Sequence, residues 1–569
     1  MYIHTIPNRQ SRPTILLREG YRENGKTRNK TLANLSALPA DVVDGLKLLL
    51  KGNVLLNDFE DPEVVESLSH GHVACLLAGA EQIGLDKLIY SRKSKNRSLS
   101  LCMILGRLLF PGSKLSLSRN IHLCTLAAEL DLEATTDEDD FYNCLDWLFL
   151  NQERIEKKLA AKHLENGKLI LYDLSSAYLE GSHCPLGKRG YSRDGRPDKL
   201  QIVFGLICTK EGCPIAIKVF EGNTSDSTTV KNVVDSLLNQ YSLSDVVIAG
   251  DRGMLCNKNI KEDFQDKPIN WIGALKKAQI ASLHRKKELD LASVADNDYK
   301  EIISNSFPGE RIIICKNPLM ASRTRTQRKS IIASVTEKLE KIVEATQRKN
   351  NRLTSKTKIA ISVGKIIKGK QKWFDLDIKE SSFSFKLNQE QIKNEELLDG
   401  VFAIRTSLPE DKASAENAIE YYKSLSKVED SFRCIKTTEI KLRPIFHRLE
   451  NRVRAHVFIC MLAYYLEWHL RKKWKDLIFD DDSPRRESII MPSRPSPEAK
   501  RKCFSKKNNQ GITVSSFNDL IINLSCIHKV KLRLPVASKV IIEKITPLNS
   551  IQRTAVAALG IEKKFVGSN

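Results

Sequence analysis

The spacing of apolar residues divides the chain into stretches with different predicted structure. Near the N-terminus, two strand-like runs flank Asn24-Gly25, a dipeptide that favours a two-residue hairpin turn. From about residue 40 to residue 165 the apolar positions recur at helical intervals instead. These patterns predict a β-hairpin followed by a mainly helical region.

The period changes again at Asn166-Gly167, after which short apolar runs predict strands. The four predicted strands are 168–174, 201–209, 214–220 and 246–249. A helix that begins at Asp226 or Ser227 precedes the last of them. If this helix is a right-handed crossover, the first and last strands run parallel to one another.

Beyond residue 267 the pattern is mixed and basic, and two further helices are predicted over 414–437 and 448–475. A run rich in Pro, Ser and Arg then predicts an exposed linker. These patterns divide the chain into seven segments: a basic N-terminal β-hairpin (1–40), a helical region (41–165), an α/β region (166–267), a basic mixed or β region (268–408), a further helical region (409–478), the linker (479–508) and a C-terminal region (509–569).

Charge narrows the class of partner. The chain has 569 residues, and 91 Lys and Arg against 69 Asp and Glu give a net charge of +22. Such a surplus favours a polyanion, either nucleic acid or an acidic membrane. No run reaches the roughly 18 apolar residues of a membrane-spanning helix, and the first residues lack the apolar core of a signal peptide. We therefore expect a cytoplasmic protein without a membrane partner.

The 13 cysteines are scattered and include no Cys-x-x-Cys pair. This pattern favours reduced, mostly buried thiols and fits neither a disulfide framework nor a zinc ribbon.

Two acidic residues stand where predicted parallel strands end. Asp173 is at the end of the first predicted strand, and Asp251 follows the last one. Since neighbouring strands lie about 4.8 Å apart, both carboxylates would come within reach of one cation. Taken alone, each residue is explained as a turn or helix-capping acid; taken together, they favour a site for divalent cations that act on phosphodiesters.

Glu429 is the candidate for a third acid. Helical spacing puts Tyr422, Glu429, Arg433 and Lys436 on one face of the predicted helix. The opposing apolar face holds Val428, Phe432 and Ile435. A plain surface ion pair between Glu429 and Arg433 explains this segment equally well when it is considered alone.

These residues belong to longer motifs, at 172–175, 190–198, 201–206, 221–226, 251–254 and 442–456. With them, the chain resembles bacterial insertion-sequence transposases of the DDE type, and more narrowly the IS-four-like group with the YREK signature, Tyr-x2-Arg-x3-Glu-x6-Lys. Tyr422, Glu429 and Lys436 stand at the spacing of that signature, while Leu425 occupies the Arg position.

The resemblance implies an α/β catalytic core, ribonuclease H-like with a mixed sheet, which a large inserted domain interrupts. It implies that Asp173, Asp251 and Glu429 are catalytic and hold two Mg²⁺ or Mn²⁺ ions. Such an enzyme cleaves DNA at the ends of its element and joins the 3′-OH ends to target DNA. The expected partners are double-stranded DNA and a second copy of the chain on that DNA, with no small-molecule substrate.

The resemblance also implies that Tyr422 and Lys436 contact the DNA backbone. Other basic residues are candidates because they adjoin the acids or lie in the inserted domain: Arg193, Arg196, Arg252, Arg433, Lys276, Lys277, Arg285, Lys286, Lys287, Arg323, Arg325 and Arg328. A solvated loop or helix face is the alternative for each of them. Two other functions stay open: an inactive, DNA-binding descendant, and a Mg²⁺-dependent nuclease that never joins ends.

Overall fold

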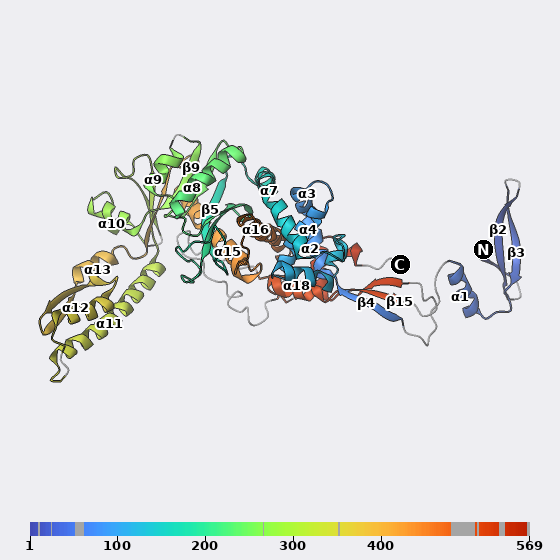
Figure 1. Cartoon of the computed structure of the whole chain (residues 1–569). Coiled ribbons are helices and arrows are strands. Elements are labelled where there is room, and N and C mark those ends of the chain that lie inside the picture. The colour runs from blue at the N-terminus through green and yellow to red at the C-terminus, as the bar shows by residue number, and fades with distance from the viewer. Residues whose placement is uncertain are drawn as a thin grey trace. The chain divides into compact units, whose positions relative to one another are not determined.

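The chain consists of two units in the computed structural model (Figure 1). One comprises Met1–Cys75, His122–Leu126 and Ile521–Asn569, and the other comprises Leu76–Ile121 and Ala127–Leu520. The structure describes residues 1–8, 12–23, 26–51, 62–265, 267–296, 298–350, 353–479, 507–508, 511, 513–533 and 541–565. The predicted turn at Asn24-Gly25 and most of the predicted linker lie outside the described residues.

An eight-stranded mixed sheet forms the centre of the second unit. Its strands are β5 (Leu169–Tyr178), β6 (Gln201–Thr209), β7 (Pro214–Glu221), β8 (Val246–Ala249), β9 (Ile269–Ala274), β10 (Tyr299–Ile303), β11 (Arg311–Lys316) and β14 (Val401–Thr406). They lie in the order β10-β11-β14-β9-β8-β5-β6-β7. The pairs β5–β8 and β8–β9 are parallel and all the others are antiparallel. The predicted order of strand, strand, strand, helix, strand is confirmed, as is the parallel pairing of the first and last strands.

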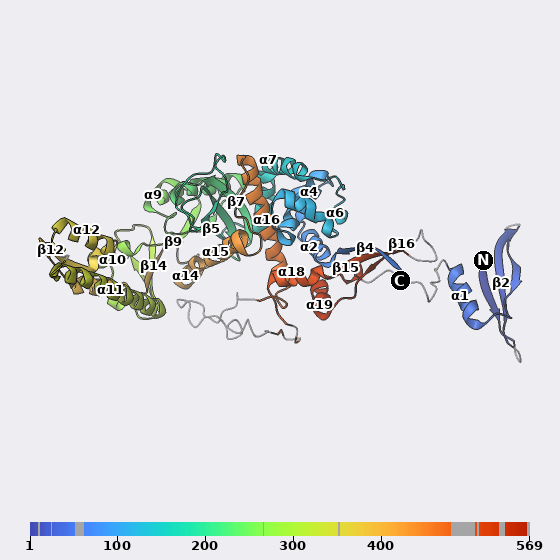
Figure 2. The ribbon, with the colours of Figure 1, turned by 60° about the horizontal axis from the view of Figure 1, so that its bottom comes forward.

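Helices cover this sheet because its strands are apolar on both faces; every residue of β6 is buried, for example. The crossover helix α8 (Asp226–Asp235) has Ser225 as its N-cap, one residue before the nearer of the two predicted positions. The long helix α16 (Glu450–Lys473) packs against β7 and against α7 (Glu138–His163) and α4 (Lys95–Leu109) (Figures 1 and 2). Most of α16 is buried around its whole circumference, which suits a helix in the interior of a large unit.

The segment predicted as an inserted domain, 268–408, contributes β9, β10, β11 and β14 to the central sheet. One hydrophobic cluster joins residues 275–314 to Val401 and Ala403. The stretch between β11 and β14 forms a second hydrophobic cluster. It contains α11 (Pro318–Gln347), α12 (Lys356–Ile367), β12 (Phe374–Lys379), β13 (Ser382–Leu387) and α13 (Gln389–Glu396). Short apolar runs in the sequence do not reveal which sheet such a strand joins.

The first unit joins the two ends of the chain. Its three-stranded N-terminal sheet holds β1 (Tyr2–Ile6), β2 (Thr14–Glu23) and β3 (Lys26–Asn34), followed by α1 (Ala40–Leu50). A second sheet pairs β4 (Glu63–Ser69) with β15 (His528–Arg533), and β15 with β16 (Ile541–Ile545). Strand β4 lies in the region predicted as helical, and its pairing with β15 connects that region to the predicted C-terminal region.

The remaining described helices have the following bounds: α2 (Gly71–Gln82), α3 (Leu85–Ile89), α5 (Lys114–Asn120), α6 (Leu126–Glu129), α9 (Asn257–Asn259), α10 (Lys277–Arg285), α14 (Ala415–Lys423), α15 (Ser426–Arg433), α18 (Phe517–Ser525) and α19 (Ser550–Ala558). None of the described helices is long and apolar enough to cross a membrane. The cysteines in the described part of the chain are free thiols, and most of them are buried.

Candidate active site

Asp173 and Asp251 lie on neighbouring parallel strands. The pairing of β5 with β8 ends at Leu171 and Ala249, and two residues further along each strand stand Asp173 and Asp251. Asp173 is in the middle of β5 and not at its end, since β5 continues to Tyr178 in pairing with β6. Asp173 nevertheless lies two residues beyond Leu171, the last residue of β5 that pairs with β8. The two carboxylates therefore leave the sheet at the same edge of this strand pair.

Glu429 reaches this edge on α15. The predicted helix over 414–437 is interrupted, because α14 ends at Lys423 and α15 begins at Ser426. The hydroxyl of Ser424 donates to the Glu420 carbonyl at 2.9 Å, and such a bond to the preceding turn bends helices. The predicted apolar face is confirmed: Val428, Phe432 and Ile435 are buried.

Phe432 fixes α15 on the sheet. Its ring meets that of Phe204 on β6 edge to face, with centroids 5.5 Å apart and the planes at 82°. Aromatic pairs of this geometry add to the free energy of simple burial. Since α15 is anchored in this way, Glu429 is held close enough to Asp173 and Asp251 for their charges to interact.

The charges of the three acids are coupled. Burial, and then the negative charges of Asp251 and Glu429, raise the pKa of Asp173 to about 7. Burial, and then Asp430 and Asp251, raise the pKa of Glu429. In some groups of described acidic, His and Cys residues, the possible ligand atoms all lie within 4.8 Å of one another. The triad is not one of these groups, so its carboxylates interact over a longer distance.

The donor set suits a divalent cation. Carboxylate oxygens are the ligands that Mg²⁺ and Mn²⁺ prefer. A fourth acid, Asp226, stands beside the triad: a Cβ added to Gly253 would lie 3.5 Å from its Oδ2 and 3.8 Å from Oδ2 of Asp251. Glycine at position 253 thus leaves room next to both carboxylates. The carboxylates of Asp173, Asp251 and Glu429 are donors of this kind.

Two further groups border the acids. Arg193 donates to Oδ1 of Asp226 at 2.6 Å, and its positive charge opposes the rise in the pKa of Asp173. Burial, and then the charge of Asp251, raise the pKa of Tyr422 to about 12, with the charge of Arg252 acting against the rise. Tyr422 therefore keeps its proton at neutral pH and can donate a hydrogen bond. The Arg252 side chain is exposed.

Lys436 lies in a buried ion cluster on the same face of β5 as Asp173. Its Nζ is 2.5 Å from Oδ1 of Asp194 and 3.0 Å from Oγ of Ser175. Arg443 pairs with the same carboxylate of Asp194. Helical spacing put Lys436 on the face of Glu429, but residues 434–438 form a π-helical turn, η6 (Cys434–Thr438), which changes the register by one residue.

Asp194 is a residue that the sequence alone did not single out. It lies within the 190–198 motif, yet no spacing linked it to Lys436 or to Arg443, which are more than 200 residues away. Its side chain is 1% exposed, whereas the Asp198 side chain in the same loop is 60% exposed. Only burial in the folded chain distinguishes the two.

The other candidate DNA contacts lie on the surface, apart from one. Arg196 pairs with Asp198 at 3.1 Å, and Arg433 pairs with Asp430. Lys276 and Lys277 are exposed at the start of α10, just beyond the carboxyl end of β9. Arg285, Lys286, Lys287, Arg323 and Arg325 are also exposed. Arg328 does not fit the expectation, because it is buried and paired with Asp399.

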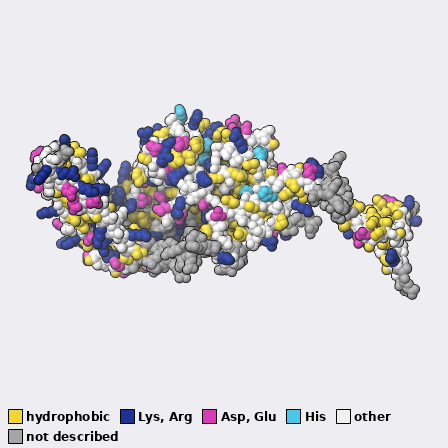
Figure 3. All heavy atoms as spheres, turned by 90° about the horizontal axis from the view of Figure 1, so that it is seen from below, with side chains coloured by type: hydrophobic (Ala, Val, Ile, Leu, Met, Phe, Trp, Pro, Cys, Tyr) yellow, Lys and Arg dark blue, Asp and Glu magenta, His cyan; other side chains and the backbone are white. Residues whose placement is uncertain are grey.

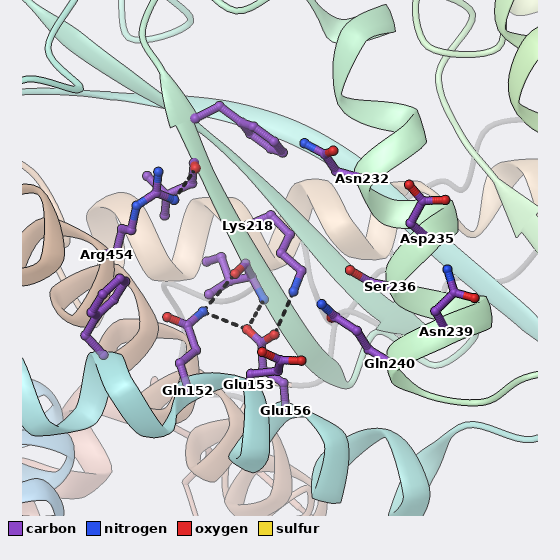
Figure 4. Close-up of a pocket in the computed structure, with 14 residues that line it drawn as sticks. Gln152, Glu153, Glu156, Lys218, Asn232, Asp235, Ser236, Asn239, Gln240 and Arg454 are labelled. Carbon is purple, nitrogen blue, oxygen red and sulfur yellow. Dashed lines mark hydrogen bonds and ion pairs between the residues drawn. The ribbon is translucent and has the colours of Figure 1, made fainter.

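A pocket of about 650 Å³ lies elsewhere, between α7, β7 and the π-helical turn η2 (Ser236–Gln240) (Figure 4). Its polar wall covers the free edge of β7. Glu156 accepts from the Ile217 N–H at 3.2 Å, and Gln152 donates to the Ile217 carbonyl at 3.1 Å. Arg454 donates to the Val219 carbonyl at 2.6 Å. These side chains take the place of a neighbouring strand, and none of the three acids lines this pocket.

The fold and the site thus define an α/β protein with clustered carboxylates suited to metal-dependent chemistry on phosphodiesters. The family described as "Transposase DDE domain" matches residues 173–466, and the chain belongs to this family. The description "IS1634 family transposase, N-terminal domain" matches residues 3–58. The chain is therefore a DNA transposase of an insertion sequence, an enzyme that cuts and joins DNA.

The chain was also compared with curated proteins and with solved structures. None of the curated proteins matches the chain. One similar solved structure is described as "Cryo-EM structure of piggyBac transposase synaptic complex with hairpin DNA (SNHP)". It is 10% identical, with a TM-score of 0.32, and the match covers 76% of this chain and 87% of that one.

Proposed function

We propose that Asp173, Asp251 and Glu429 are the catalytic triad of this transposase and that they hold two Mg²⁺ ions, for which Mn²⁺ can substitute. The observation that carries the proposal is the coupling of three acids from distant segments, which raises the pKa of Asp173 to about 7. When bound, the two ions would activate the attacking oxygen and stabilise the leaving one. Water is the first nucleophile, and the freed 3′-OH is the second.

The surrounding side chains bind phosphate in this proposal. Tyr422 offers its hydroxyl beside the acids, and Arg193, Arg196, Arg252 and Arg433 offer positive charge. Lys436 binds the end of the element from its place beside Ser175, where the phosphate competes with Asp194 for the ammonium group. This assignment follows the YREK signature, although Leu425 stands at its Arg position in this chain.

The proposal also assigns roles to the domains of the chain. Strands β5–β9 with α15 form the ribonuclease H-like core, which the order of their pairing supports. The inserted part of 268–408 guides DNA, with Lys276 and Lys277 at its start. In support, Lys and Arg side chains gather over α11–α13 (Figure 3). Exposed members of this group include Arg323, Arg325, Lys329, Lys338, Lys341 and Lys365.

The ends of the element bind to the hairpin (1–40) and the helical region (41–165) in this proposal. Residues 409–478 complete the core, and 479–508 connect it to the C-terminal region, 509–569. Two protomers act together on the DNA, because cutting and joining both ends needs two active sites. The enzyme works in the bacterial cytoplasm, at the nucleoid.

The test is a cleavage and strand-transfer assay with the full chain and DNA that carries the element ends. Asp173→Asn, Asp251→Asn and Glu429→Gln should keep end binding in a gel-shift assay and lose Mg²⁺-dependent cleavage. Asp245→Asn is the matched control, since Asp245 lies at the other end of β8, paired with Lys412 at 3.1 Å. Cleavage by the triad variants would contradict the assignment.

Two outcomes with the wild-type chain separate the alternatives. End binding without cleavage in Mg²⁺ or Mn²⁺ would identify an inactive DNA-binding descendant. Cleavage without joined products would identify a nuclease.

A further inference from the structure

A second cluster of metal-ligand residues lies away from the acids, where α7, α16 and the turn between β6 and β7 come together. His163 is the last residue of α7, His469 is near the end of α16, and Cys213 directly precedes β7. One ligand atom of each of the three residues lies within 4.8 Å of the others. Gaps of 50 and 256 residues separate them, so no sequence spacing could reveal the cluster.

The turn that carries Cys213 is well determined by its hydrogen bonds. Thr209 donates its N–H to the Cys213 carbonyl at 3.0 Å, and Gly212 donates to the Thr209 carbonyl at 2.9 Å. Gly212 has a φ of +86°, and an added Cβ would come within 3.1 Å of Lys427. A larger residue would strain this turn. The thiol is therefore held at a fixed place, and Cys213 is 1% exposed.

One side chain of the cluster lacks a partner. Nε2 of His469 is buried and makes no hydrogen bond within the described part of the chain. The ring centroids of His163 and His469 are 5.9 Å apart. Nε2 of His163 is 2.8 Å from the Tyr465 hydroxyl. A buried polar nitrogen without a partner is costly, and a bound metal ion is one way to satisfy it.

The electrostatics permit metal binding. Burial lowers the pKa of both His163 and His469 to about 4, so each imidazole is neutral at pH 7 and has a lone pair to offer. Burial raises the pKa of the Cys213 thiol to about 12, while Lys472 and Lys162 favour its thiolate. The thiol thus keeps its proton until a dication displaces it.

We propose that His163, Cys213 and His469 bind a zinc ion. Two imidazole nitrogens and one thiolate are a donor set that Zn²⁺ prefers, and a fourth position remains for water or the Tyr465 hydroxyl. On binding, a Zn–S bond replaces the S–H bond of Cys213, and the proton passes to solvent. The ion would tie the β6–β7 hairpin of the central sheet to the ends of two helices.

A second group of close ligand atoms, Cys434, Glu439 and Glu467, does not support a similar site. Arg471 donates to Glu467 at 2.7 Å and to Glu439 at 3.0 Å, so a cation already neutralises these acids.

The test measures zinc in the purified full chain, after growth with added zinc and dialysis, by mass spectrometry of the element. Wild type should hold about one zinc per chain. Replacement with Co²⁺ should give a thiolate-to-cobalt charge-transfer band in the near ultraviolet. Cys213→Ser and His469→Gln should lose the zinc and the band. Cys315→Ser is the matched control, as Cys315 is also buried but lies on β11.

Asp173→Asn separates this site from the acids, because it should keep both the zinc and the band. Circular dichroism checks that each variant is folded, and His163→Gln replaces any variant that is not. Wild type without zinc and without the cobalt band would overturn the proposal. A band that persists in Cys213→Ser would overturn it as well.

Discussion

Replacing Asp173 with asparagine should stabilise the metal-free protein at alkaline pH, although it removes a carboxylate that we assign to catalysis. Burial, Asp251 and Glu429 raise the pKa of Asp173 from 3.8 to about 7. The unfolded chain keeps the lower value. Above pH 7 the Asp173 carboxylate is ionised in both states, but ionisation costs more free energy in the folded state. This difference lowers the free energy of unfolding.

The shift of about three units in pKa corresponds to about 4 kcal/mol, at about 1.36 kcal/mol per unit. Because the pKa of the folded state is the higher one, the penalty is small near pH 4, grows as the pH rises, and is complete above about 7. Asparagine keeps the oxygen that accepts the Leu174 N–H at 2.8 Å. The substitution thus removes the charge and little else.

Urea unfolding in the presence of EDTA, at pH 4 and pH 8, measures the effect. The gain for Asp173→Asn should be near zero at pH 4 and should approach about 4 kcal/mol at pH 8. Asp245→Asn, an exposed carboxylate paired with Lys412, should show no such increase. At pH 8, Mg²⁺ should stabilise the wild type but not Asp173→Asn.

A variant that is no more stable than wild type at pH 8 would refute this reasoning. It would mean that neither burial nor the neighbouring acids oppose the ionisation of Asp173.

Three other outcomes are expected. The Mg²⁺ concentration needed for half-maximal cleavage should rise as the pH falls below about 7, since Asp173 must lose its proton to bind the ion; a flat profile between pH 6 and 8 would contradict this. Asp194→Asn should lower the free energy of unfolding by about 3 kcal/mol in urea, because it leaves the buried Lys436 and the half-buried Arg443 without a counter-charge; an unchanged midpoint would argue against a buried pair. Glu156→Ala should uncover the edge of β7 and cause self-association in size-exclusion chromatography, and a monodisperse variant as stable as wild type would show that Glu156 does not protect this edge.

The strands around the acids could be predicted from the sequence because their signals are local. Strands β5 to β8 are short apolar runs, and β8 falls where the pattern placed it. The position of Asp251 follows directly from the end of that run. The extension of β5 past Asp173 was missed because Ser175 and Ser176 are polar, although both are buried and hydrogen-bonded to Lys436 and to the Arg193 N–H.

The features that the sequence did not reveal depend on contacts between distant segments. Strand β4 is ordered by pairing with β15, more than 450 residues away. Lys436 stands in a π-helical turn and pairs with Asp194, which belongs to another loop. His163, Cys213 and His469 lie on three separate elements. In each case the residue types are ordinary, and only the folded chain brings them together.

The central claim is that Asp173, Asp251 and Glu429 hold the same metal ions. Iron-mediated backbone cleavage tests it most directly: Fe²⁺ replaces Mg²⁺ in the purified protein, ascorbate and peroxide then generate hydroxyl radicals at the metal, and the cut sites are mapped. The account predicts cuts near all three residues, which excess Mg²⁺ suppresses and which all disappear together in Glu429→Gln. Cuts near only one of the three, or an unchanged pattern in Glu429→Gln, would contradict it.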